Sequence, residues 1–307
     1  MSSIDASVTT STTLRQALQN AHALGLARLD AQWLLLHALQ KPVSSRAWLL
    51  THDSDAMTAP QSLAYHALLE RRIAGEPLAY LVGYKEFFGL NLTVDARVLV
   101  PRPDTETLVH WALQVLAVPG NWTNSGAMDV LDLGTGSGAV ALAIAHTLRA
   151  RSQAARVLAV DASVQALEVA ADNARQLGLS VNFLHSDWLN NVTGQFHLIV
   201  SNPPYIAAAD PHLAALGHEP LRALVSGADG LDDICTIIGQ APGHLKADGW
   251  LLLEHGYDQA DAVCNLLEQA GFVGVGSRLD LAGIARCSGG QWPACCKLAN
   301  REIIAAK

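Results

Sequence analysis

A short string after one predicted strand has the residue types to hold a planar NH2 group: Asn202, Pro203, Pro204 and Tyr205. Such a group carries two donors, so its site needs two convergent acceptors and few competing donors. The Asn202 side-chain oxygen and the Pro203 carbonyl are acceptors, and neither proline has an N–H. Tyr205 adds a flat face for an amide or a base. In isolation the string is equally consistent with a rigid turn.

A glycine-rich segment follows another predicted strand and opens an apolar helix. Glycines there let the backbone approach a ligand, and the helix start offers free N–H groups. The pattern matches the dinucleotide fingerprint, so by itself it does not separate a nicotinamide cofactor from S-adenosylmethionine. The residues expected to contact the cofactor here are Gly134, Thr135, Gly136, Ser137 and Gly138.

Two further strand ends add candidate cofactor ligands. Asp161 ends the second strand, where a carboxylate can accept from both ribose hydroxyls. Asp187 and Trp188 end the third strand and are expected beside an adenine, although the type of Trp188 is as consistent with a core residue. The acceptors at Asn202 favour S-adenosylmethionine, because hydride transfer has no use for them and methyl transfer to an NH2 group does. Asn202 is therefore expected to lie at the cofactor as well.

The strands that position these residues belong to a repeating pattern of strand, glycine turn and helix. This pattern predicts a doubly wound α/β sheet. The last two strands have no long helix between them, which predicts an antiparallel end. The expected strands are 129–133, 156–161, 181–185, 197–201, 249–255, 273–279 and 284–287.

The first part of the chain has a different pattern, because apolar residues recur at helical spacing from Leu14 onward. It predicts a small helical domain. Alternating residues then predict a β-hairpin with strands at 87–94 and 98–100 and a turn at 95–96. The expected divisions are a helical domain over 1–82, a hairpin linker over 83–103, a methyltransferase domain over 104–290 and a tail over 291–307.

A polar string follows the hairpin. Asp104 is a good N-cap for a helix running to about Leu116. Capping does not explain Arg102, which lies between two prolines. We expect Arg102 and Glu106 to contact the substrate.

Composition excludes some classes of protein. The net charge is −8 and only 16% of residues are charged, which argues against a protein that wraps bare nucleic acid. The chain shows neither a signal peptide nor an apolar run of membrane length. The five cysteines lack C-x-x-C spacing and the histidines are scattered, so we expect reduced thiols and no metal site. A cytoplasmic monomer is the expectation.

From about Leu14 to Cys287 the chain resembles the HemK/PrmC family of N5-glutamine methyltransferases, which modify bacterial class-I peptide chain release factors. Beside the glycine loop, the shared segments are 28–31, 71–77, Pro101-Arg102-Pro103-Asp104-Thr105-Glu106, Ser201-Asn202-Pro203-Pro204-Tyr205, 219–224 and 253–256. The resemblance implies a seven-stranded class-I methyltransferase sheet with an antiparallel last strand. It also implies that the preceding helical domain over 1–82 is a substrate-recognition domain. It also implies S-adenosylmethionine as the cofactor, a substrate glutamine gripped by residues 202–205, and catalytic roles for Asn202, Pro203 and Tyr205. That glutamine ends the Gly-Gly-Gln loop of the release factor.

Two other functions fit part of the pattern. Adenine-N6 methyltransferases of DNA or RNA share the Asn-Pro-Pro-Tyr string, but the acidic charge and the lack of a basic recognition domain count against them. A non-catalytic module that binds S-adenosylmethionine is the second alternative. The residues 289–291 are themselves Gly-Gly-Gln, so self-methylation there is a hypothesis, although a three-residue match is typical of chance.

Overall fold

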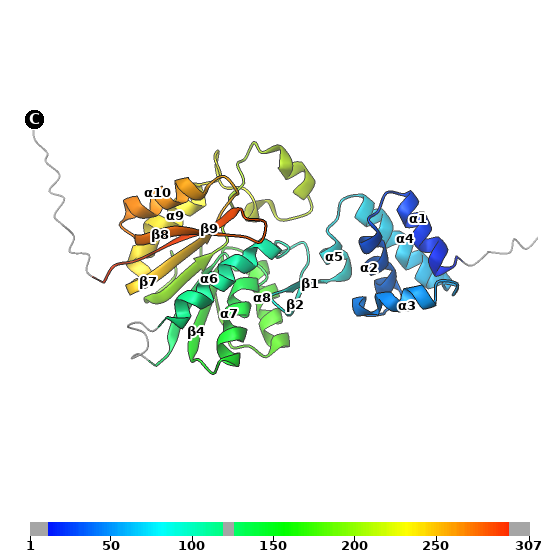
Figure 1. Ribbon diagram of the computed structural model, residues 1–307, viewed down its shortest axis with the longest axis horizontal. Coiled ribbons are helices and arrows are strands. Elements are labelled where there is room, and N and C mark those ends of the chain that lie inside the picture. Colours follow the sequence, from blue (N-terminus) through cyan, green and yellow to red (C-terminus); the bar gives the residue numbers. More distant parts are fainter. Residues whose placement is uncertain (1–11, 119–125, 295–307) are drawn as a thin grey trace, which may run out of the picture. The chain divides into compact units, whose positions relative to one another are not determined.

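The computed structural model describes residues 12–118 and 126–294, and the chain separates into two compact units, Met1–Tyr84 and Lys85–Lys307 (Figure 1). Each unit has its own buried core. Within the described ranges, every helix is too short or too polar to cross a membrane. The expected tail lies mostly at residues 295–307, outside the described ranges.

The first unit is helical. Thr13 and Thr58 begin two of its helices with reciprocal capping boxes that involve Gln16 and Gln61, so sequence signals fix these starts. The residues Leu34, Leu35 and Leu36 are fully buried in its core. Its elements are α1 (Leu14–Ala23), α2 (Arg28–Ala38), the 3-10 helix η1 (Val43–Ser45), α3 (Arg46–Thr51), α4 (Ala59–Ile73) and α5 (Leu78–Val82).

The second unit contains the predicted seven-stranded sheet, in the order β5-β4-β3-β6-β7-β9-β8. Pairing is parallel from β5 to β7, and β9 is antiparallel to both of its neighbours. The α/β fold and the antiparallel last strand are confirmed. The strands are β3 (Met128–Leu133), β4 (Ala155–Asp161), β5 (Asn182–His185), β6 (Phe196–Ser201), β7 (Leu245–Glu254), β8 (Val273–Leu279) and β9 (Ala285–Gln291).

Helices cover both faces of this sheet, so alternate residues of a strand enter different cores. In β3, Val130 packs with the core formed by α6 (Glu106–Ala117), α7 (Ala139–Ala150) and α8 (Val164–Leu177). Its neighbours Leu131 and Leu133 pack with the core of α9 (Asp232–Gln240) and α10 (Ala260–Ala270). Because both faces of the sheet are buried, the sequences of its strands are nearly continuous apolar runs.

The predicted hairpin exists, but its position was wrong. It joins β1 (Tyr84–Phe87) to β2 (Leu90–Thr93), and Phe88 and Gly89 form its turn with φ of 52° and 76°. Two successive positive φ values match the right-handed twist of paired strands, which the expected turn at 95–96 does not supply. Residues 98–100 are not a strand, because the Val100 N–H donates to the Glu219 carboxylate at 3.0 Å instead.

The expected N-cap at Asp104 was also wrong. Asp104 lies inside the 3-10 turn η2 (Pro103–Thr105) that precedes α6, and its carboxylate pairs with Arg286 at 3.4 Å. The cap position of α6 is Thr105, whose side chain makes no capping bond. The remaining 3-10 helices are η4 (Pro211–Leu216), η5 (Leu221–Ala223) and η6 (Ala241–His244).

Candidate active site

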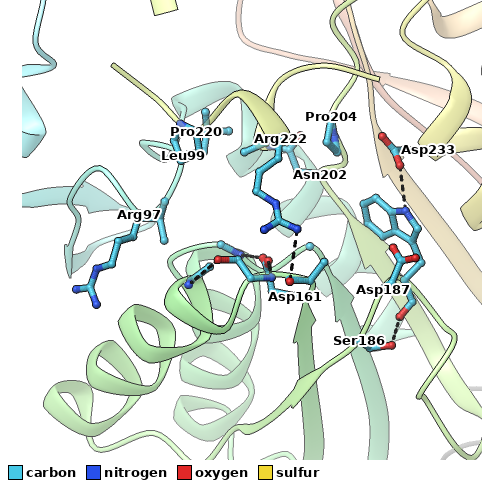
Figure 2. A pocket seen from close by; sticks show the side chains of 18 residues that line it. Arg97, Leu99, Asp161, Ser186, Asp187, Asn202, Pro204, Pro220, Arg222 and Asp233 are labelled. Carbon is cyan, nitrogen blue, oxygen red and sulfur yellow. Dashed lines mark hydrogen bonds between the residues drawn. The ribbon is translucent and has the colours of Figure 1, made fainter. Parts of the chain in front are cut away.

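A cavity opens at the carboxyl ends of β3, β4, β5 and β6, where open α/β sheets bind their ligands (Figure 2). These strands are adjacent in the sheet, so residues from distant parts of the sequence meet there. The predicted site residues among its lining are Gly134, Gly136, Asp161, Asp187, Trp188, Asn202 and Pro204.

The glycine loop after β3 has a left-handed backbone that requires glycine. Gly134, Gly136 and Gly138 have φ of 68°, 56° and 85°. A Cβ on Gly134 would lie 3.3 Å from the Trp188 ring, whereas one on Gly136 would meet no protein atom within 4 Å and would project into open space. Because Gly136 also lines the cavity, this space is available to a ligand.

A buried carboxylate, that of Asp132, stabilises the glycine loop through hydrogen bonds. Asp132 is 1% exposed and accepts from the Thr135 hydroxyl at 2.6 Å and from the Ala141 N–H at 3.1 Å. Burial raises the pKa of Asp132 to about 7, although these two donors act in the opposite direction. Asp132 and Thr135 therefore position the loop from the protein side.

Asp161 lies at the end of β4, as predicted, and faces the cavity (Figure 2). Its carboxylate accepts from the Gly136 N–H at 2.9 Å and from the Ser163 N–H at 2.8 Å, so both oxygens are fixed. Burial raises its pKa, which the two amides and nearby Arg222 partly offset. Carboxylate oxygens keep free lone pairs after such contacts and can accept from a ribose diol.

Trp188 forms a wall of the cavity and is held in a strained backbone conformation with φ of 44°. Its indole N–H donates to Asp233 at 3.0 Å, and the Ser186 hydroxyl donates to its carbonyl at 2.7 Å. Asp187 lines the cavity beside it (Figure 2). An apolar wall next to a carboxylate suits a purine with an exocyclic amino group.

The Asn202 side chain has a defined orientation at the end of β6. Its Nδ2 donates to the Thr105 hydroxyl oxygen at 3.2 Å, which leaves Oδ1 as the free acceptor. Pro203 is buried and Pro204 lines the cavity. Burial raises the pKa of Tyr205, so its phenol stays neutral.

The other predicted substrate contacts are engaged within the protein. Arg102 forms an ion pair with Glu219, a buried residue that also accepts from Val100. Glu106 accepts from the Phe88 N–H at 3.0 Å, in the hairpin turn. Neither lines the cavity, and their contact with substrate stays a prediction.

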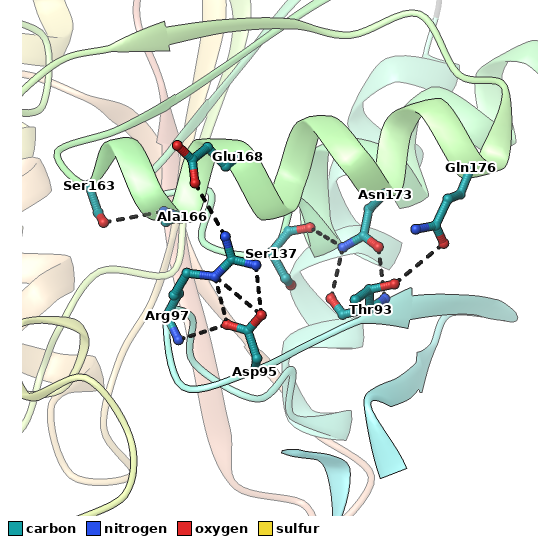
Figure 3. A network of polar contacts seen from close by, with 9 residues as sticks. All are labelled: Thr93, Asp95, Arg97, Ser137, Ser163, Ala166, Glu168, Asn173 and Gln176. Atoms are coloured by element: carbon teal, nitrogen blue, oxygen red, sulfur yellow. Dashed lines mark hydrogen bonds and ion pairs between the residues drawn. The ribbon is translucent and has the colours of Figure 1, made fainter. Parts of the chain in front are cut away.

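A polar network connects the segment after the hairpin to this cavity (Figure 3). Fully buried Asn173 on α8 accepts from the Thr93 N–H at 2.7 Å and donates to the carbonyls of Thr93 and Ser137, at 3.0 Å and 2.9 Å. Arg97 pairs with Asp95 and Glu168 and lines the cavity. Thr93, at the end of β2, thus shares its partner Asn173 with the glycine loop.

Several lining residues were missed by sequence reasoning. Arg222 reaches toward the Ala162 carbonyl at 3.5 Å, above Asp161 (Figure 2). Arg222 is in the shared segment 219–224, which was the one available signal. Pro220 is in the same segment, whereas no sequence signal marked Arg97, Leu99, Ser163, Ser186 and Asp233 as lining residues.

Comparisons with known proteins agree with this geometry. Family models match residues 12–83, as the PrmC N-terminal domain, and residues 114–220, as the methyltransferase small domain. The release factor glutamine methyltransferase of Xylella fastidiosa (strain Temecula1) is 46% identical over 281 residues, which cover 90% of this chain and 98% of that protein. That of Bordetella pertussis is 48% identical over 270 residues, covering 87% and 95%.

The chain belongs to the release factor glutamine methyltransferase family. Membership confirms the predicted class of enzyme, a methyltransferase that uses S-adenosylmethionine. The solved hMettl16 catalytic domain is 16% identical with a TM-score of 0.52, covering 78% of this chain and 84% of that chain, and it supports the fold alone.

The Gly-Gly-Gln string of this family member belongs to β9. Gly289 and Gly290 pair with Leu252 and Leu251 of β7, and the Gln291 amide donates to the Asp248 carbonyl at 3.0 Å. A Cβ on Gly289 would lie 2.5 Å from Leu252, so the sheet requires glycine there. Self-methylation of this string stays a hypothesis, and its residues are part of the folded sheet.

Proposed function

We propose that this chain transfers a methyl group from S-adenosylmethionine to the side-chain nitrogen of the glutamine in the Gly-Gly-Gln loop of class-I release factors. The observation that carries the proposal is that Asn202, with its oxygen free, lines the same cavity as Gly136 and Asp161. Family membership supports the choice of substrate.

The residues of the cavity fit this cofactor. Gly136 leaves space that a side chain would occupy, Asp161 offers acceptors for a ribose diol, and Trp188 with Asp187 suits an adenine. S-adenosylmethionine, when bound, supplies an activated methyl group on a sulfonium. We expect Thr135, Ser137 and Gly138 to shape the loop around it.

The chain's own contribution is alignment, because an amide nitrogen is a weak nucleophile whose lone pair is delocalised. Asn202 Oδ1 and the Pro203 carbonyl hold the two amide hydrogens, which turns the lone pair toward the methyl group. They also stabilise positive charge that develops on the nitrogen. Tyr205 packs against the amide, and alignment of this kind lowers a barrier by up to roughly 7–11 kcal/mol.

Labelled S-adenosylmethionine offered to several acceptors tests this function. We expect label in a class-I release factor, and none in the same factor with its loop glutamine replaced or in DNA. Label in DNA would favour the adenine-N6 alternative. Cofactor binding without any transfer would favour the non-catalytic one.

A further inference from the structure

Glu254 is a buried carboxylate beside the corner formed by Asn202 and Tyr205. It ends β7, is 1% exposed, and neither side-chain oxygen makes a hydrogen bond of standard geometry within the described residues. The Thr105 and Tyr205 hydroxyls and the Arg286 charge nevertheless stabilise its ionised form. A buried carboxylate with such weak partners is unfavourable for stability, so a functional reason for it is worth seeking.

Thr105 connects this carboxylate to the substrate corner. Its hydroxyl oxygen accepts from Asn202 Nδ2 at 3.2 Å, and Thr105 itself is 3% exposed. A hydroxyl that accepts from an amide still has one proton to donate, and an ionised carboxylate can only accept. Hydrogen bonds along these three side chains can therefore run in one direction. The Asn202 NH2 donates to the Thr105 hydroxyl, and the hydroxyl donates to the Glu254 carboxylate.

We propose that Glu254, acting through Thr105, is a positioning residue that fixes the Asn202 amide with its oxygen toward the substrate nitrogen. The inference rests on the proposed function, since it assumes that the substrate presents an NH2 group there. Without this constraint the Asn202 amide can turn over and place its own NH2 against that of the substrate, where two donors meet.

Protonation of Glu254 should remove the constraint. A neutral carboxyl can donate its proton to Thr105, whose hydroxyl is then free to donate to Asn202 Oδ1 and stabilise the reversed amide. Burial raises the pKa of Glu254 to about 7. The charged and titratable groups that act on or sense Glu254 are Asp104 of η2, Tyr205 after β6, and Arg286 and Cys287 of β9.

The test compares Thr105→Val, Thr105→Ser and Glu254→Gln with the wild-type chain. Turnover, KM for a release factor and the Kd of S-adenosylmethionine are measured for each. We expect Thr105→Val and Glu254→Gln to lower kcat about tenfold, because a hydrogen bond of about 1.4 kcal/mol corresponds to that factor. Thr105→Ser keeps the hydroxyl and should restore most of kcat, and cofactor Kd should stay unchanged in all three.

A matched control is Thr147→Val on α7, which removes a hydroxyl bonded to the Ala143 carbonyl at 2.9 Å and should leave kcat unchanged.

The pH profile of kcat separates a positioning role of Glu254 from a purely structural one. Wild-type kcat should fall as pH decreases through about 7, the pKa of Glu254, and Glu254→Gln should lose this limb.

Wild-type kcat in Thr105→Val, or a retained acidic limb in Glu254→Gln, would overturn the inference while the proposed function stands. If Thr105→Val does not fold, the Glu254→Gln profile decides. No methyl transfer by the wild-type chain would overturn the proposed function, and the inference with it.

Discussion

The Asn202 side chain lines the cavity, and its nitrogen is bound to Thr105, which leaves its oxygen as the acceptor. The residue after it, Pro203, has a carbonyl and no N–H. Two acceptors of this kind favour the binding of an NH2 group, which has two donors, over the binding of a carboxylate, which only accepts. The chemistry of the corner therefore depends on one amide orientation.

Asn202→Ala removes the side-chain acceptor and leaves the glycine loop intact. We expect kcat for release factor methylation to fall on the order of 100-fold, in line with the loss of one polar group that stabilises developing charge. The Kd of S-adenosylmethionine, measured by calorimetry, should change less than about threefold. Equal losses in both quantities would show that Asn202 mainly shapes the cofactor pocket.

The buried carboxylate at Glu254 also predicts a pH dependence of stability. Its folded-state pKa of about 7 lies above the ordinary value of 4.5. Its stabilising contribution to the free energy of unfolding is therefore fully present below pH 4.5 and is lost as pH rises through 7. Glu254→Gln should therefore flatten the pH dependence of the unfolding free energy by about 2–3 kcal/mol. Chemical denaturation between about pH 5 and 8 measures it.

Asp132 titrates in the same range, with a pKa also raised to about 7, and contributes equally to both proteins in that comparison. Identical slopes for wild type and Glu254→Gln would contradict the buried, weakly paired state of Glu254.

At the scale of elements, α8 connects β2 to the glycine loop through Asn173 (Figure 3). Asn173→Ala leaves three backbone groups, those of Thr93 and the buried Ser137 carbonyl, without these partners, so we expect a loss of about 2–3 kcal/mol in stability and weaker cofactor binding. Gln176→Ala is the control, because this residue on the same helix makes one long contact of 3.4 Å to the Thr93 hydroxyl. Similar effects of both variants would refute the special role of Asn173.

Two glycines of the loop should respond differently to alanine. A Cβ on Gly138 would lie 2.9 Å from Leu142 and 3.2 Å from Ala170, so Gly138→Ala should lower stability by about 2–4 kcal/mol from overpacking and left-handed strain. A Cβ on Gly136 meets no protein atom within 4 Å but enters the cavity. Gly136→Ala should mainly weaken cofactor binding.

Thermal unfolding and cofactor titration of both variants check this contrast. A larger stability loss in Gly136→Ala than in Gly138→Ala would mean that the empty space at Gly136 is required by the fold and not by a ligand.

For the whole molecule, sequence predicted the elements whose signals are local. Strands buried on both faces gave continuous apolar runs, and apolar residues at helical spacing from Leu14 onward marked the helical unit. The predicted position of the hairpin was wrong because its turn passes through Phe88, a residue type rarely found at positive φ, which gives no local sequence signal. The prediction that Asp104 is an N-cap was wrong because a tertiary ion pair with Arg286 competes for the carboxylate.

The lining of the candidate site was predictable only where its residues lie at the ends of strands. The glycine loop, Asp161, Asp187, Trp188 and Asn202 share this position, and parallel topology brings them together. Asp233 and Arg222 come from a helix and a 3-10 turn whose contacts depend on packing across the sheet edge. Thr105 and Glu254 were within recognised segments, but only the structure places Thr105 next to Asn202 and Glu254 near Thr105 and Tyr205.

The measurement that tests the account most directly is a crystal structure of the chain with S-adenosylhomocysteine and a peptide containing Gly-Gly-Gln. We expect the glutamine nitrogen within about 3.2 Å of both Asn202 Oδ1 and the Pro203 carbonyl, on the side of the cavity where the sulfur lies. A glutamine bound away from Asn202, or an Asn202 amide that turns its nitrogen toward the substrate, would contradict it.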